Sequence, residues 1–215
     1  MRLEKNRIGR DFVCGDIHGC FDDLETGLAE KKFDKEKDRL FSVGDLIDRG
    51  PRSDLAASYM DQPWFFTVMG NHENLFLMGS LDIPERLDYW TDHLLCGGGW
   101  AYKMEPKKQT ALLNAVDRLP LIIQAGDVII THAALPAVDS LETIEKKPFA
   151  YMETLLWHRG AYPPIAIPGI SRVYVGHTPT SRPYRSGKTM NIDTGAFRKY
   201  HQREGKLTIL ESGGE

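Results

Sequence analysis

The sequence predicts an α/β fold built on a parallel β-sheet, and three stretches in the first third of the chain lead to this prediction. Short apolar runs end at Gly15, Gly44 and Gly70. A segment that favours a helix follows each of these glycine turns. Because strands that alternate with helices pair in parallel, this order indicates a parallel sheet with right-handed crossover connections.

The three strand–helix units take up the first third of the chain. We expect strands at 11–14, 40–43 and 64–69, each followed by a helix, at 21–31, about 53–60 and from 75 onward. Leu24 and Leu28 lie at helical spacing in the first helix, and Ser53 is a candidate cap for the second.

The middle of the chain, residues 82–118, is polar and mostly helical in composition. Leu87, Trp90 and Leu94 recur at helical spacing, the glycine run 97–99 interrupts the pattern, and a second helical stretch spans about 105–116. We interpret this region as a helical cap that packs beside the sheet. The whole chain, residues 1–215, is therefore expected to form a single domain.

The last third of the chain returns to strands. Two apolar runs at 121–124 and 128–131 flank Ala125-Gly126-Asp127, a pattern typical of a hairpin. The other expected elements are a short helix at 152–157 and strands at 172–175, 190–193 and 206–210.

Composition limits the class of protein and its partners. The formal net charge of −3 leaves no broad basic field, so nucleic acid is not an expected partner. No stretch is apolar enough to span a bilayer and the N-terminus lacks a secretory signal, so we expect a cytoplasmic protein without membrane association. Cys14, Cys20 and Cys96 have no CxxC spacing, which fits a reducing compartment. We also expect a monomer.

Polar side chains suited to metal binding follow the expected strands. They are Asp16, His18, Asp45, Asp48, Asn71, His72, His132 and His177. Because ligands of an open α/β sheet bind at the carboxyl ends of its strands, we expect these side chains to converge. The mixed oxygen and nitrogen set suits two borderline cations such as Mn²⁺, Fe or Zn²⁺ that share a bridging carboxylate. Such a pair can hold a hydroxide and stabilise an in-line displacement at phosphorus.

Each of these residues also has a simpler interpretation when it is taken alone. Asp16 or Asp45 after a glycine can be a turn or helix-capping residue, and His132 can be a hydrogen-bonded core histidine. His177 can belong to an ordinary Gly-His-Thr-Pro turn. The ordered set of five such turns is hard to obtain by chance and favours the metal site.

Three sequence blocks carry a resemblance to a known family. They are Gly-Asp-Ile-His-Gly at 15–19, Gly-Asp-Leu-Ile-Asp-Arg-Gly at 44–50 and Gly-Asn-His-Glu at 70–73. Together they resemble the signature blocks of the PPP-type serine/threonine protein phosphatases, in their small bacterial and phage branch. These enzymes are calcineurin-like metallophosphoesterases. The likeness extends through 97–100, 157–159 and 192–196. It implies a β-sandwich flanked by helices, with two metal ions at the strand ends.

The resemblance also implies a role for each matching residue. His72 would be the general acid that protonates the leaving alkoxide, with Asp48 orienting it. Arg49 and Arg159 would bind the phosphoryl oxygens. Expected ligands are Asp16 and His18 for the first metal, Asp45 as the bridge, and Asn71, His132 and His177 for the second.

The expected activity is hydrolysis of phosphoserine or phosphothreonine in proteins or peptides, with phosphotyrosine left open. The expected cofactors are two divalent cations, Mn²⁺ before Fe or Zn²⁺. An alternative is a symmetrical diadenosine tetraphosphate hydrolase, a family that shares much of the motif pattern. That family differs at the positions of Asp48 and Glu73, which favours the protein phosphatase. A catalytically inactive binding module is a third alternative, but no expected ligand is missing here.

Overall fold

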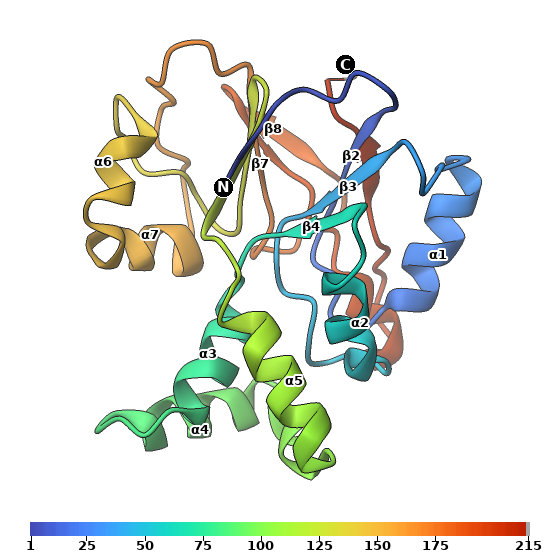
Figure 1. Ribbon diagram of the computed structural model, residues 1–215, viewed down its shortest axis with the longest axis vertical. Helices are drawn as coiled ribbons and strands as arrows, with labels where there is room; N and C mark the ends of the chain where they lie inside the picture. The colour runs from blue at the N-terminus through green and yellow to red at the C-terminus, as the bar shows by residue number, and fades with distance from the viewer. Residues whose placement is uncertain (214–215) are drawn as a thin grey trace.

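The computed structural model describes residues 1–213 and contains two β-sheets with helices around them (Figure 1). One sheet has four strands, in the order β10 (Ile209–Glu211), β2 (Asp11–Cys14), β3 (Arg39–Ser42) and β4 (Phe65–Thr67). The other has six, in the order β1 (Arg2–Leu3), β5 (Ile122–Ala125), β6 (Val128–Thr131), β7 (Arg172–Val175), β9 (Thr189–Asn191) and β8 (Tyr184–Ser186). This architecture confirms the helix-flanked β-sandwich that the resemblance implies.

The observed strand order agrees in part with the alternation of strands and helices in the sequence. Strands β2, β3 and β4 pair in parallel, as the repeated strand–helix pattern predicts. The hairpin of β5 and β6 is also confirmed. The alternation alone does not predict the second sheet, in which β5 pairs with β1 at the N-terminus and β6 pairs with β7. The alternation pattern contains no signal for these long-range pairings.

The two sheets bury a shared apolar layer between them. It consists of Val13, Phe41, Val43 and Val68 from one side and Ile123, Ala125, Val128, Ile130, Tyr174 and Ile192 from the other. Phe12 and Leu40 alternate with Val13 and Phe41 along their strands and belong to a second apolar cluster, which also contains Leu24. Because both faces of β2 and β3 are covered, their sequences are apolar runs without alternation.

The helices surround the sheets in three groups (Figure 1). Beside the four-stranded sheet lie α1 (Phe21–Glu30) and α2 (Ala56–Met60), and beside the six-stranded sheet lie α6 (Leu141–Glu145) and α7 (Met152–Trp157). The third group, at one end, is α3 (Asn71–Ser80), α4 (Arg86–Leu95) and α5 (Pro106–Val116). Four 3-10 helices complete the set: η1 (Ser53–Leu55), η2 (Gly98–Lys103), η3 (Pro148–Tyr151) and η4 (Ala196–His201).

Some predicted boundaries are wrong for identifiable reasons. Ser53 does not cap a helix, because its hydroxyl accepts a hydrogen bond of 2.8 Å from the backbone N–H of Asp48. The closing strand β10 starts at Ile209, three residues later than predicted, since the N–H and the carbonyl of Lys206 bind Thr194 and not β2. Helix α6 falls in a stretch where the sequence suggests only a loop.

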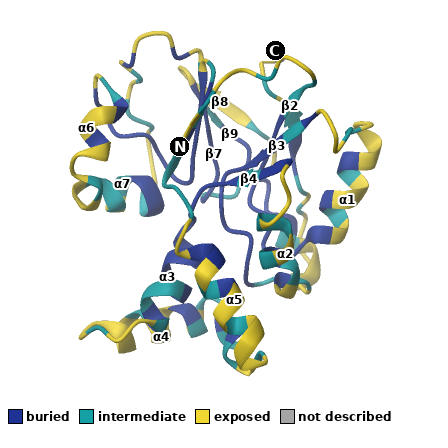
Figure 2. Cartoon of the chain, viewed as in Figure 1, coloured by how far each residue is buried: buried dark blue, intermediate teal, exposed yellow. Residues whose placement is uncertain are grey.

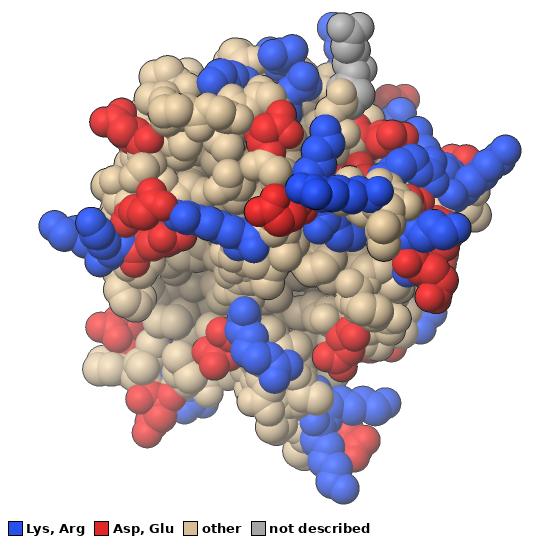
Figure 3. Space-filling view, turned by 45° about the horizontal axis from the view of Figure 1, so that its top comes forward, with Lys and Arg blue, Asp and Glu red and all other residues tan. Residues whose placement is uncertain are grey.

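The strands are mostly buried, and most charged side chains lie on the surface. Figure 2 shows the strands largely buried, while the outer sides of the helices are exposed. Figure 3 shows basic and acidic side chains interspersed over one face, in keeping with the small net charge. Within residues 1–213, every helix is too short or too polar to cross a membrane.

A buried carboxylate ties together the turns that follow β3 and β4. Glu73, in the first turn of α3, is fully buried. Its Oε2 accepts hydrogen bonds of 2.9 Å from the N–H groups of Asp45 and Gly70. Its Oε1 accepts bonds of 2.8 and 3.2 Å from those of Leu46 and Ile47. One side chain therefore satisfies four backbone donors and fixes the second motif against the third.

We predict that Glu73→Ala lowers the free energy of unfolding by at least about 3 kcal/mol, because buried backbone donors lose their acceptor. Urea denaturation measures this loss. The control is Glu36→Ala, which removes an exposed carboxylate and should change the free energy by less than about 0.5 kcal/mol. Equal stability of the two variants would contradict the role given to Glu73.

Candidate metal centre

The predicted ligands and the predicted acid His72 directly follow strands of both sheets, in turns or at the start of α3. Asp16 and His18 come after β2, Asp45 after β3, Asn71 and His72 after β4, His132 after β6 and His177 after β7. The backbone of His18, Asp45 and His177 adopts the left-handed region, with φ of 44°, 49° and 68°. Such conformations are uncommon for residues other than glycine and concentrate at functional sites. The turns therefore fix the backbone from which these three side chains extend.

One group of donors consists of His132, His177, Asn71 and Asp45. The Nδ1–H of His132 donates to the Val43 carbonyl over 2.8 Å, which leaves a lone pair on Nε2. That Nε2 lies 2.9 Å from Asn71 Oδ1, 3.2 Å from His177 Nδ1 and 3.5 Å from Asp45 Oδ1. Asn71 Oδ1 also lies 2.9 Å from His177 Nδ1.

The chemistry of this first group fits a cation. A lone pair on His132 Nε2 faces the oxygens of Asn71 and Asp45, and all three atoms are acceptors. Buried acceptors that face one another require a positive charge or a proton between them. Two imidazoles and two oxygens form a ligand set that suits Zn²⁺, Fe or Mn²⁺. The described residues therefore fit a divalent cation at this point.

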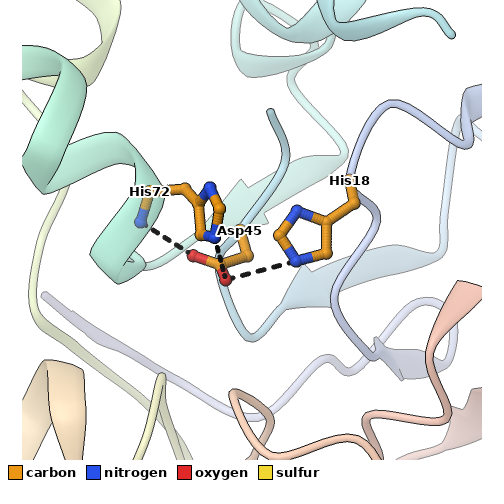
Figure 4. Close-up of side chains that lie close together, drawn as sticks. All are labelled: His18, Asp45 and His72. Carbon is orange, nitrogen blue, oxygen red and sulfur yellow. Dashed lines mark hydrogen bonds and ion pairs between the residues drawn. The ribbon is translucent and has the colours of Figure 1, made fainter. Parts of the chain in front are cut away.

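A second group lies on the other side of Asp45 and contains His18 and His72 (Figure 4). The Nδ1–H of His18 donates to the Ile47 carbonyl over 2.8 Å, so its Nε2 also carries a lone pair. Asp45 Oδ2 lies 3.4 Å from His18 Nε2 and 3.9 Å from His72 Nε2. Asp45 thus turns one oxygen toward each group, which is the placement expected of a bridging carboxylate.

Asp16 differs from the other expected ligands in its contacts. It is buried, and its carboxylate accepts a hydrogen bond of 3.1 Å from the backbone N–H of His177. Burial and the nearby charges of Asp193 and Asp45 raise its pKa well above the ordinary value. Gly176 leaves the space for it, because a Cβ there would lie 1.9 Å from Asp16 Oδ1. The turn that carries His177 therefore holds Asp16, whose carboxylate belongs to neither group of possible ligands found among the described residues.

Burial sets the protonation states of the histidines. Loss of water contact lowers the pKa of His18 and of His177 to about 3, and it also lowers the pKa of His132. Burial opposes ionisation of Asp45, but the surrounding histidines outweigh it and lower its pKa below the ordinary range. At neutral pH the three imidazoles are neutral and the carboxylate is charged, which are the forms that bind metal.

The two expected phosphate-binding arginines are placed differently. Arg49 Nη1 donates a hydrogen bond of 2.8 Å to His18 Nε2, and its guanidinium lies 4.7 Å from the centre of the Phe197 ring. Because that nitrogen has one lone pair, Arg49 must leave it before a cation can bind there. Arg159 is exposed in the loop after α7, and its charge adds to the burial that lowers the pKa of His177.

The family model for calcineurin-like phosphoesterases matches residues 12–210, which include every turn described above and, apart from β1, strands of both sheets. The chain belongs to the calcineurin-like phosphoesterase family.

Relatives of this phosphoesterase include enzymes with two different names. It is 33% identical over 204 residues to serine/threonine-protein phosphatase 1 of Salmonella typhimurium, covering 91% of this chain and 90% of the relative. It is 37% identical over 130 residues to a symmetrical bis(5'-nucleosyl)-tetraphosphatase of Hamiltonella defensa, covering 58% of this chain and 44% of the relative. The likeness to the phosphatase therefore runs through more of both chains.

The fold is also that of solved structures in this family. A protein serine/threonine phosphatase from Saccharomyces cerevisiae superposes with a TM-score of 0.65 and 22% sequence identity, over 99% of this chain and 76% of that one. At this identity the likeness supports the fold and not the substrate.

The sequence analysis missed His93, a buried residue that contacts Asp48 in the phosphoesterase site. Asp48 Oδ2 accepts a hydrogen bond of 2.6 Å from His72 Nδ1, which matches the predicted pairing. The helical region adds two more donors, because Trp100 Nε1 lies 2.7 Å and His93 Nε2 3.1 Å from Asp48 Oδ1. The Tyr102 hydroxyl lies 3.0 Å from His93 Nδ1.

Several features show that His93 is built into the site. It is fully buried, and Gly98 leaves room for its ring, since a Cβ there would lie 2.2 Å from His93 Nε2. Burial alone would raise the pKa of Asp48, but the hydrogen bonds from His72 and His93 outweigh it and lower that pKa to about 2. No motif surrounds His93 in the sequence, so only helical spacing from Trp90 pointed to an inward side chain.

We predict that His93→Ala lowers the free energy of unfolding by about 2 kcal/mol or more, because a hydrogen bond to a charged group and buried packing are both lost. Chemical denaturation provides the measurement. Asp92→Ala alters the exposed neighbour on the same helix and serves as the control. If both variants unfold at the same urea concentration, His93 does not anchor the helical region to Asp48.

Proposed function

We propose that this protein is a metal-dependent phosphoprotein phosphatase that hydrolyses phosphoserine and phosphothreonine monoesters. The observation that carries the proposal is the state of His72. Its Nδ1 is bound to Asp48, while its buried Nε2 has no hydrogen-bond partner within residues 1–213 and points toward Asp45 (Figure 4). An imidazole held in this way can deliver a proton to a leaving group beside Asp45.

The need for an acid follows from the substrate. A serine or threonine alkoxide is a poor leaving group, and a positioned acid contributes roughly 10²–10⁴-fold to the rate of its departure. Asp48 keeps the imidazole of His72 aimed, because the Asp48 carboxylate is itself held by hydrogen bonds from His93 and Trp100. A site that served only esters with good leaving groups would gain little from this arrangement.

Two divalent cations, Mn²⁺ before Fe or Zn²⁺, are the proposed cofactors. Asp16 and His18 would hold the first, and Asn71, His132 and His177 the second, with Asp45 bridging them. When bound, the cations supply Lewis-acid charge for the phosphoryl oxygens and lower the pKa of the attacking water.

The arginines complete the binding of the phosphoryl group. A guanidinium can donate two parallel hydrogen bonds to a phosphoryl oxygen pair. Arg49 already lies at the edge of the site, and Arg159 is exposed in the loop after α7. We propose that both bind the non-bridging oxygens and orient the ester for His72.

A symmetrical diadenosine tetraphosphate hydrolase is the second candidate, and the relative of that name in Hamiltonella defensa supports it. The Asp48–His72 pair argues for the protein phosphatase. The deciding experiment compares phosphoserine and phosphotyrosine peptides with diadenosine tetraphosphate at equal concentrations of Mn²⁺-loaded enzyme. Faster turnover of the phosphoserine peptide supports the proposal, and exclusive turnover of the nucleotide refutes it.

We predict that prolonged dialysis against excess EDTA abolishes hydrolysis of p-nitrophenyl phosphate, because the charges that activate water are removed with the cations. Added Mn²⁺ should restore the rate. The control sample is dialysed in parallel without chelator. Full activity after verified removal of metal would refute the metal mechanism.

We predict that His72→Asn slows turnover of alkyl phosphates by roughly 10²–10⁴-fold and that of p-nitrophenyl phosphate by much less. Nitrophenolate leaves without an acid, whereas an alkoxide does not. Steady-state kinetics on both esters, with metal content measured for each preparation, test this difference. An equal loss for the two esters would reject the general-acid role.

A further inference from the structure

A large pocket lies directly beside the metal centre. Its volume is about 940 Å³, and it is bordered by the turn after β3, by the helical region and by η4. Arg49 and Phe197 line it and also contact the site: Arg49 donates to His18 Nε2, and the Phe197 ring centre lies 5.0 Å from that of His18. Anything bound in the pocket is therefore next to a bound phosphoester.

The pocket is positively charged in a protein whose net charge is −3. Its lining contains three guanidinium groups, from Arg49, Arg198 and Arg203, and a single carboxylate, from Asp54. Asp54 already pairs with Arg52 at 3.4 Å. In the part of the chain that the structure describes, no carboxylate oxygen lies within 4.0 Å of a nitrogen of the three lining arginines.

The segment that supplies two of these arginines is well fixed. Arg198 lies in η4, which begins after Gly195 and ends before Gln202, both in the left-handed region with φ of 68° and 56°, and Arg203 follows Gln202 directly. Backbone hydrogen bonds join Arg198 N–H to the Gly195 carbonyl and Arg203 N–H to the Arg198 carbonyl, at 2.9 and 3.1 Å. These bonds fix the backbone at Arg198 and Arg203, and both side chains line the pocket together with Arg49.

Apart from Ser53 and His201, the rest of the lining is apolar, and part of it comes from the helical region. Leu95 is 81% exposed at the rim, and Trp100 and Phe197 supply aromatic surface. A phosphoryl group alone would not use this surface. A peptide would, because the aliphatic part of a side chain can lie on the apolar wall while its charged end reaches the arginines.

We propose that this pocket selects phosphopeptides that carry acidic side chains beside the phosphorylated residue. The proposal rests on the proposed phosphatase function and adds the sequence context of its substrate. The phosphate binds at the metal centre, and a neighbouring Asp or Glu pairs with Arg198 and Arg203. A nucleoside polyphosphate would offer the same anionic chemistry, so the experiment separates the two sources.

The experiment measures kcat/KM for three phosphoserine peptides of equal length whose flanking residues are acidic, neutral or basic. For the wild-type protein we expect the acidic peptide to exceed the neutral one by about fivefold or more, and the basic peptide to be poorest. In Arg203→Glu this acidic-to-neutral ratio should fall to about one or below. Added salt should lower the wild-type ratio, because exposed charges are screened.

The matched control is Lys188→Glu, which makes the same change in charge at an exposed residue. Lys188 lies at the opposite end of the sheet, since its carbonyl pairs with Val173 near the start of β7 and His177 follows the end of that strand. The control should keep the wild-type ratio. Arg198→Gln, assayed in the same way, provides a second variant if Arg203→Glu folds poorly.

The outcomes separate the proposal from the function on which it rests. Hydrolysis of all three peptides with a wild-type ratio near one, or a ratio that survives both arginine variants, overturns the acidic-context proposal and leaves the phosphatase function standing. Hydrolysis of diadenosine tetraphosphate alone overturns both. Peptide hydrolysis in which the arginine variants impair only diadenosine tetraphosphate assigns the pocket to nucleotide phosphates and overturns the peptide proposal.

Discussion

The position of the Asp45 carboxylate is the constraint on which the rest of the site depends. One of its oxygens faces His132 and the other faces His18 and His72. Its backbone is held in the left-handed region, and its own N–H is bound to Glu73. A carboxylate in water samples many orientations. The Asp45 carboxylate has a single buried orientation between two sets of nitrogen donors. The two sheets together bring the turns that carry these nitrogen donors to the same point.

A second layer of contacts connects the helical region to the chemistry. The Asp48 carboxylate forms hydrogen bonds with His72 from α3, His93 from α4 and Trp100 from η2. The same helical region contributes Leu95 and Trp100 to the wall of the basic pocket. The proposed substrate contacts and the orientation of His72 therefore depend on the same helical region. A change in the packing of α4 would affect His72, the proposed proton donor, through the Asp48 carboxylate.

The sequence predicted the centre of this arrangement well, because its signals are local. An apolar run, a glycine and a polar residue identify the ends of β2, β3 and β4, and the hairpin of β5 and β6 has an equally local pattern. What the sequence could not predict depends on long-range pairing. Strand β1 pairs with β5, which lies more than one hundred residues away in the sequence. His93 contacts Asp48 because α4 packs on α3. Ser53 likewise binds the Asp48 N–H instead of capping a helix, a choice that only the folded turn determines.

The central claim is that two cations share Asp45, and anomalous X-ray diffraction from crystals grown with Mn²⁺ tests it most directly. Data collected at the manganese absorption edge should give two peaks on either side of the Asp45 carboxylate, one near His18 and one near His132. A single peak, or peaks that avoid Asp45, would contradict the account.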